Sequence, residues 1–267
     1  MAVTWDYASG QSLGGRQEQE DYCDVQKNDG AVVCVLADGM GGHAAGAMAA
    51  QLAVSHFLKS TAEARTPRSD NFLPALYASN DAIADYVSNH PDCEGMGCTL
   101  IGVELDPNGL RWISVGDSKI FWKTGNGIAQ INADHSMAGR LAIAVKNGEM
   151  TEQEARDSPS RHLLLSAVTG DHISKLDYNA QGLSAAPGDV LLIATDGIDT
   201  LTLSEIDALL DRHKKDNVAT ISQALIGAVA DRALPRQDNT TLIVARAGHG
   251  NTFAGDSIAT RPLRQAR

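Results

Sequence analysis

Four aspartates in this chain stand at the ends of apolar segments, where a rigid strand could hold a carboxylate in place. Asp38 follows the apolar run at residues 31–37, and Asp117 and Asp196 each follow another such run, whereas Asp238 precedes the last one. A lone aspartate at a strand end is usually a turn former, but each of these four adjoins a glycine or asparagine. If the strand ends converge, the carboxylates must bind cations or protonate. Hard oxygen ligands favour Mg²⁺ or Mn²⁺ over zinc.

The sequence around Asp38, L-A-D-G-M-G-G-H at residues 36–43, is the strongest local motif. Glycine lets the backbone turn sharply after the strand and brings the Gly39 carbonyl oxygen close to a bound ion. The same letters also form a loose dinucleotide fingerprint, which we keep as an alternative. Two features disfavour it, because a carboxylate directly before the first glycine would repel a pyrophosphate and no acid-terminated strand follows the next helix.

A charged segment near the N-terminus combines one guanidinium, Arg16, with the carboxylates Glu20 and Asp21. Arginine suits a bidentate grip on phosphate. Taken alone, however, such a run is more typical of a solvated loop.

The elements that must position these side chains follow from hydrophobic period and turn residues. Pairs of strands interrupted by pairs of helices predict α+β layering. Residues 134–169 turn helical and polar, with a capping box at residues 151–154. The predicted strands cover residues 31–37, 98–105, 110–115, 120–122, 128–131, 190–195 and 240–246, and the predicted helices cover residues 44–59, 71–90, 204–211 and 218–232.

The overall composition excludes several classes of protein. With a net charge of −11 and no basic run, the chain is not suited to a nucleic-acid partner. No apolar stretch reaches the length of a membrane span, and we expect no secretory signal. The four cysteines lack the spacing of a disulfide framework or metal knuckle, which predicts reduced thiols in a cytoplasmic protein.

Taken in order, the motifs resemble those of the PPM/PP2C family of metal-dependent serine/threonine protein phosphatases, bacterial type. The resemblance covers roughly residues 5–246. It is carried by R-x-x-x-E-D at residues 16–21, D-G-M-G-G-H at 38–43, G-M-G-C-T-L at 95–100, V-G-D-S-K at 115–119, A-D-H-S at 133–136, A-T-D-G-I at 194–198 and D-N-T-T at 238–241.

The resemblance implies a four-layer αββα sandwich, in which two central antiparallel sheets are flanked by helix pairs. We expect a single phosphatase domain at residues 1–247, with residues 134–169 as a variable flap beside the active site. Residues 248–267 are expected to form a frayed C-terminal tail.

The resemblance also implies two core Mn²⁺ or Mg²⁺ ions. Asp38 is expected to bridge them. One ion is held by Asp196 and Asp238, and the other by Glu20, partly through water, and by the Gly39 carbonyl.

Further roles follow from the same resemblance. Asp117, sharing Asp196, is expected to bind a third and weaker ion. Arg16 is expected to grip the substrate phosphoryl group, while Asp21 and Asn239 orient the ligands.

The implied reaction is hydrolysis of phosphoserine and phosphothreonine by direct attack of a hydroxide that bridges the two ions. Met40 stands where some eukaryotic members have a histidine that protonates the leaving group. We expect His43 to have a structural role instead, and a metal-bound water to donate the proton.

The expected substrates are phosphoproteins, opposed to a bacterial Ser/Thr kinase, and the expected state is a monomer. Two other functions stay open, a pseudophosphatase that keeps the fold as a binding module and a phosphatase of small molecules. All the expected carboxylates are present, which favours an active enzyme.

Overall fold

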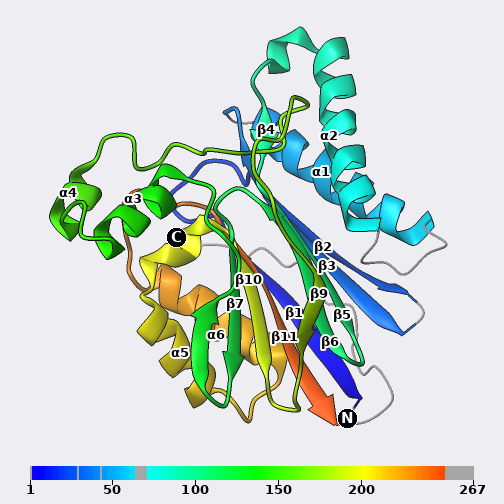
Figure 1. Ribbon diagram of the computed structural model, residues 1–267, viewed down its shortest axis with the longest axis vertical. Coiled ribbons are helices and arrows are strands. Elements are labelled where there is room, and N and C mark those ends of the chain that lie inside the picture. The colour runs from blue at the N-terminus through cyan, green and yellow to red at the C-terminus, as the bar shows by residue number, and fades with distance from the viewer. Residues whose placement is uncertain (1, 29, 43, 64–70, 250–267) are drawn as a thin grey trace.

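The computed structural model describes residues 2–28, 30–42, 44–63 and 71–249, and in this part of the chain the elements form four layers (Figure 1). All paired strands run antiparallel. The first sheet has the order β1 (Val3–Ser12), β11 (Thr240–His249), β10 (Val190–Ala194), β7 (Lys119–Thr124) and β8 (Gly127–Gln130). The second has the order β2 (Asp21–Asn28), β3 (Ala31–Met40), β5 (Leu100–Asp106), β6 (Gly109–Val115) and β9 (Asp177–Ser184), with β4 (Gly97–Cys98) beside β3.

Each sheet carries a helix pair on its outer face. Helices α1 (Ala44–Glu63) and α2 (Phe72–Asn89) cover the second sheet. Helices α5 (Leu203–Arg212) and α6 (Val218–Ala230) cover the first. The predicted α+β sandwich of two antiparallel sheets between helix pairs is therefore confirmed.

The apolar strands of the sequence are buried on both faces. Along β3, Val33 and Val35 pack toward α1 and α2, while Cys34 and Leu36 pack between the two sheets. The side chains of β11 alternate in the same way, some packing in the core between the two sheets and the others packing toward α5 and α6. A strand enclosed on two sides has no polar alternation, which explains why these segments read as continuous apolar runs.

Three strands have no counterpart among the predicted elements. Strands β2 and β9 are rich in polar residues, and β9 lies at an edge of its sheet with no buried residue. Strand β1 does alternate, since Val3, Trp5 and Tyr7 are buried and the residues between them are half-buried. An alternation with a period of two residues is the pattern by which the sequence could have predicted β1.

The predicted helices are confirmed with small shifts at their ends. Helix α1 continues to Glu63, four residues beyond the predicted end. Helix α2 ends at Asn89 because Pro91 starts the short 3-10 helix η2 (Pro91–Cys93).

The expected helical flap contains two short helices and a long return segment. Helix α3 (Met137–Lys146) begins after the cap Ser136, and α4 (Glu152–Asp157) has the predicted capping box at Thr151 and Glu154. Both helices project from one end of the sandwich (Figure 1). The chain then returns to the body in an extended form, paired through Ser136–Leu164 and Cys98–Val168 bridges.

Among the helices of the described ranges, none combines the length and the apolar character that a membrane crossing requires. Of the expected tail at residues 248–267, Gly248 and His249 instead belong to β11 and pair with Thr4 and Val3 of β1. Residues 250–267 lie outside the described residues.

Candidate metal centre

The four strand-end aspartates meet at one end of the sandwich. Asp117 lies where the chain passes from β6 in one sheet to β7 in the other, and Asp196 opens the 3-10 helix η3 (Asp196–Thr200) after β10. Asp38 lies near the end of β3, and Asp238 lies just before β11. All four line a single hollow of about 750 Å³. The structure thus brings together the aspartates that the sequence placed only along the chain.

The other predicted site residues lie at the same hollow or directly behind it. Arg16, Glu20, Gly39 and Asn239 line it. Asp21 is buried behind the site and pairs across the strands with Asp38.

Asp38 is held by its backbone. Its N–H donates to the Thr99 hydroxyl at 3.0 Å, and the Thr99 N–H donates to the Asp38 carbonyl at 2.9 Å. The Thr99 hydroxyl also hydrogen-bonds Ser118, the neighbour of Asp117, at 2.8 Å. Thr99 therefore fixes two of the aspartates relative to one another.

Burial and mutual repulsion disfavour the charged forms of these carboxylates. Burial, together with the nearby Asp21, Asp196 and Asp117, raises the pKa of Asp38 well above its usual range. Burial, with Asp117 and Asp238 nearby, raises the pKa of Asp196 to about 7. Burial also raises the pKa of Asp117. In the described part of the chain, the buried Asp196 Oδ1 has no hydrogen-bond partner. This donor set of hard, crowded oxygens fits divalent cations such as Mn²⁺ or Mg²⁺.

Glu20 reaches the site through a close contact between strand and helix. The Gly39 N–H donates to the Glu20 carbonyl at 3.2 Å. A side chain at Gly39 would collide with the Gly46 carbonyl in the first turn of α1. A Cβ at Gly46 would lie 2.5 Å from Oε2 of Glu20. The two glycines therefore let the Glu20 carboxylate lie between β3 and α1.

A threonine and an asparagine link the two sheets behind the hollow. The Thr195 hydroxyl donates to Asp21 at 2.9 Å and accepts from the Thr241 N–H at 2.9 Å. The Asn239 side chain accepts from the Glu20 N–H at 2.9 Å and donates to the Leu13 carbonyl at 2.9 Å. Sequence reasoning missed the threonines, although each lies inside one of the recognised motifs.

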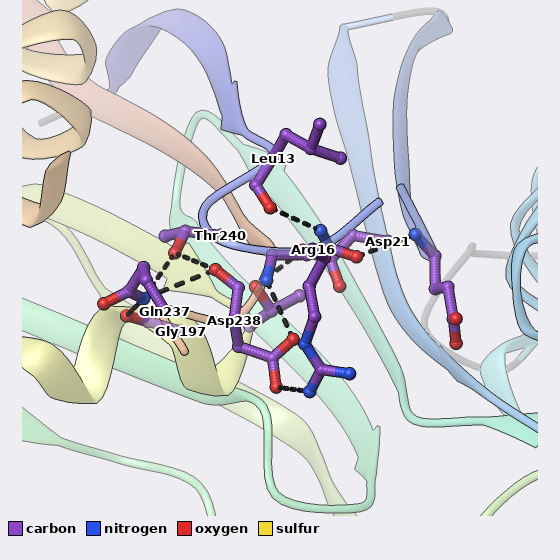
Figure 2. Close-up of polar contacts among 10 residues, drawn as sticks. Leu13, Arg16, Asp21, Gly197, Gln237, Asp238 and Thr240 are labelled. Atoms are coloured by element: carbon purple, nitrogen blue, oxygen red, sulfur yellow. Dashed lines mark hydrogen bonds and ion pairs between the residues drawn. The ribbon is translucent and has the colours of Figure 1, made fainter. Parts of the chain in front are cut away.

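Arg16 lies at the mouth of the hollow and is paired with Asp238. The Arg16 guanidinium donates to Asp238 Oδ2 at 2.5 Å, and Figure 2 shows the two side chains pointing toward one another. With the side chains in this arrangement, no three His, Cys, Asp or Glu side chains of the described residues are placed to hold one ion. In this arrangement the Asp238 carboxylate is occupied by Arg16.

The return segment of the flap forms the opposite wall of the hollow. This wall includes His162, Leu163, Leu164 and Leu165, and His172 just beyond the flap also lines the hollow. Sequence reasoning named neither histidine, because no motif marks them. Met40 lines the hollow, whereas His43 lies outside the described residues.

The strand pairing disagrees with the alternative of a dinucleotide site. Strand β3 pairs antiparallel with both β2 and β5. A dinucleotide fingerprint requires parallel strands joined by a crossover helix.

Comparisons with known proteins agree with this geometry. The sequence model described as protein phosphatase 2C matches residues 13–237. The chain is 32% identical over 219 residues to the serine/threonine protein phosphatase PstP of Mycobacterium tuberculosis, a match that covers 81% of this chain and 40% of PstP. It is 27% identical over 192 residues to the serine/threonine phosphatase stp of Listeria monocytogenes, covering 70% and 74% of the two chains.

A solved structure shows the same fold with metal ions. The crystal structure of the catalytic domain of PstP in complex with two manganese ions is 30% identical, with a TM-score of 0.75 over 92% of this chain and 100% of that one. This chain spans about 40% of the length of the curated PstP. Since the family model matches most of the sequence, the chain belongs to the protein phosphatase 2C family.

Proposed function

We propose that this protein is a metal-dependent serine/threonine protein phosphatase. The observation that carries the proposal is the convergence of four aspartates, drawn from both sheets, on one hollow with an arginine at its mouth. Crowded carboxylates need cations, and an arginine beside bound cations suits a phosphoryl group. The printed functions of the relatives, and the two manganese ions in the PstP structure, support the same reaction.

In this proposal Asp38 bridges two Mn²⁺ or Mg²⁺ ions. Asp196 and Asp238 hold one ion, and Glu20 with the Gly39 carbonyl holds the other. Bound there, the ions supply Lewis acidity and a water that ionises near neutral pH. Asp117 and Asp196 together hold a third, weaker ion.

The protein's own groups position the substrate. The Arg16 side chain is 54% exposed and its present partner is a carboxylate, so its guanidinium can exchange Asp238 for the phosphoryl oxygens of a substrate. Asn239 holds the Glu20 backbone, and Asp21 with Thr195 holds the strand ends in register. These contacts keep the ligands in place while Arg16 moves.

The proposed substrates are proteins phosphorylated on serine or threonine by a bacterial Ser/Thr kinase. The kinase partner, the monomeric state, the cytoplasmic location and the single domain at residues 1–247 stay predictions from the sequence. A pseudophosphatase is disfavoured because all the carboxylates expected to bind metal line the hollow. A phosphatase of small molecules is separated from a protein phosphatase by the experiment below.

The test compares Mn²⁺-dependent hydrolysis of phosphothreonine peptides, phosphotyrosine peptides and an aryl phosphate. We expect phosphothreonine peptides to be hydrolysed, and the Asp38→Asn variant to lose activity by more than about 100-fold, beyond the usual effect of residues that only support metal ligands. Asp92→Asn, which changes an exposed aspartate in η2, is the matched control. Absence of Mn²⁺-dependent hydrolysis of every substrate, or an active and folded Asp38→Asn variant, would contradict the proposal.

A further inference from the structure

A second hollow of about 360 Å³ adjoins the metal centre. The two hollows share Asp117, Asp196, Asp238 and His162 as a common border. Beyond that border the second hollow is lined by residues of a different kind, including Leu234 and the exposed arginines Arg161 and Arg236. A substrate peptide with its phosphoryl group at the aspartates can therefore extend into this second hollow.

Arg236 stands on a turn that is fixed from below by a buried glutamine. Gln237 is 6% exposed, and its N–H donates to the Leu234 carbonyl at 3.1 Å, which closes the turn. The Gln237 side chain donates to the Gly197 carbonyl at 3.1 Å and accepts from the Thr200 hydroxyl at 2.6 Å. Figure 2 shows the Gln237 side chain directed at Gly197. The turn is thus tied to η3, the same element that carries Asp196.

The same turn packs against the segment that carries Arg16. The Gly15 N–H donates to the Gln237 carbonyl at 2.7 Å, and a Cβ at Gly15 would lie 2.8 Å from the Pro235 carbonyl oxygen. Arg236 is separated from Asp238 by a single residue. Its backbone is therefore held at a constant position relative to the proposed phosphate-binding side of the metal centre.

Several of the other charged side chains around the second hollow are already engaged. Lys119 contacts Asp134 at 3.0 Å and Asp199 at 3.5 Å, and Arg16 contacts Asp238. Asp117 and Asp196 belong to the proposed metal sites. Arg161 and Arg236, by contrast, make no ion pair with any residue that the structure describes. Of these two arginines, Arg236 is the one that stands on the turn tied to η3. Its five N–H donors are available to a ligand from outside.

We propose that Arg236 is a specificity-determining residue that binds an anionic side chain of the phosphoprotein substrate. The inference rests on the proposed phosphatase function and adds a preference to it. An extended peptide advances about 3.3–3.6 Å per residue, so anionic side chains within three residues of the phosphorylated one are the candidates for this contact. A carboxylate and a second phosphate both match the forked guanidinium.

The test uses phosphothreonine peptides that carry alanine, glutamate or a second phosphothreonine at one position, placed up to three residues to either side of the reacting phosphothreonine. For each enzyme the measured quantity is the ratio of kcat/KM between the anionic and the alanine peptide, which does not depend on the amount of folded enzyme. We expect the native protein to favour an anionic peptide by about fivefold, the upper range for an exposed ion pair. The glutamate and phosphothreonine arms show which anion Arg236 binds.

Substitutions at Arg236 test whether this residue causes the preference for anionic peptides. Arg236→Ala is expected to bring the ratio close to one, and Arg236→Glu is expected to reverse it. Arg212→Ala removes an exposed arginine at the end of α5, outside both hollows, and is expected to keep the native ratio.

Two results would overturn the inference while leaving the phosphatase proposal intact. One is hydrolysis of the peptides without any anionic preference, and the other is a preference that persists in Arg236→Ala. Failure of the native protein to hydrolyse any peptide would instead contradict the proposed function on which the inference rests.

Discussion

At the scale of single residues, the absence of a side chain at Gly46 positions a proposed metal ligand. Gly46 is buried in the first turn of α1, and a Cβ there would lie 2.5 Å from Oε2 of Glu20. That oxygen is the end of a flexible side chain, so the carboxylate can move aside at little cost to the fold. The displacement would, however, remove it from its position beside Gly39.

We therefore predict that Gly46→Ala raises the Mn²⁺ concentration needed for half-maximal activity by at least about threefold, a smaller effect than deletion of a ligand-supporting group. Gly227→Ala in α6 is the matched control, because a Cβ at Gly227 would meet no atom within 4 Å. The control is expected to stabilise the protein by up to about 1 kcal/mol through helix propensity, with an unchanged Mn²⁺ requirement. Equal metal requirements in the two variants would argue against Glu20 as a ligand.

At the scale of elements, two helices share the same capping device in different surroundings. Thr202 and Glu205 cap α5, which buries Ile206 and Leu210 against the first sheet. Thr151 and Glu154 cap α4 in the flap, which buries none of its residues. The capping hydrogen bonds of the two helices are alike. How much each cap contributes to global stability therefore depends on whether its helix packs against the sandwich.

Thr202→Ala is accordingly predicted to lower the free energy of unfolding by about 1 kcal/mol, the usual value of a lost N-cap. Thr151→Ala is predicted to leave the global value unchanged and to speed amide hydrogen exchange within α4 alone. Urea unfolding and native-state hydrogen exchange measure the two effects. A global loss in Thr151→Ala as large as that in Thr202→Ala would show that the flap folds together with the sandwich.

At the scale of the whole molecule, closing the two sheets together gathers buried carboxylates at one end. Burial raises the pKa of both Asp21 and Asp196 to about 7. In the unfolded chain the pKa of an aspartate is about 4. Between these values the folded, metal-free protein holds protons that the unfolded chain releases, so its stability falls as the pH rises.

We predict that the chelator-treated protein loses stability from about pH 4 to about pH 7 relative to the Mn²⁺-loaded protein, because bound cations replace the protons. The difference between the two forms is the quantity to measure, by urea unfolding across this range. His135 changes the stability in the opposite direction in both forms, because burial lowers its pKa. Its contribution to stability is lost as the pH falls below the pKa that histidine has in the unfolded chain. Parallel pH profiles with and without Mn²⁺ would refute the prediction.

The sequence by itself determined the parts of this protein that depend on neighbouring residues. The enclosed strands β3, β10 and β11 are apolar along their length, and the capping box at Thr151 is local. The site aspartates could be predicted because each follows or precedes such a strand and belongs to an ordered motif. Strand β1 could also have been predicted, since Trp5 and Tyr7 alternate with less buried residues.

Only the tertiary structure decided the features that depend on residues far apart in the chain. Strands β2 and β9 are polar and are held by pairing with β3 and β6, so local pattern could not assign them. The support of Asp21 by Thr195 spans 174 positions. The fixed turn beneath Arg236 depends on Gln237 reaching Gly197. Such contacts form when two sheets close on each other, and the fixed position that gives Arg236 its proposed role exists only after that closure.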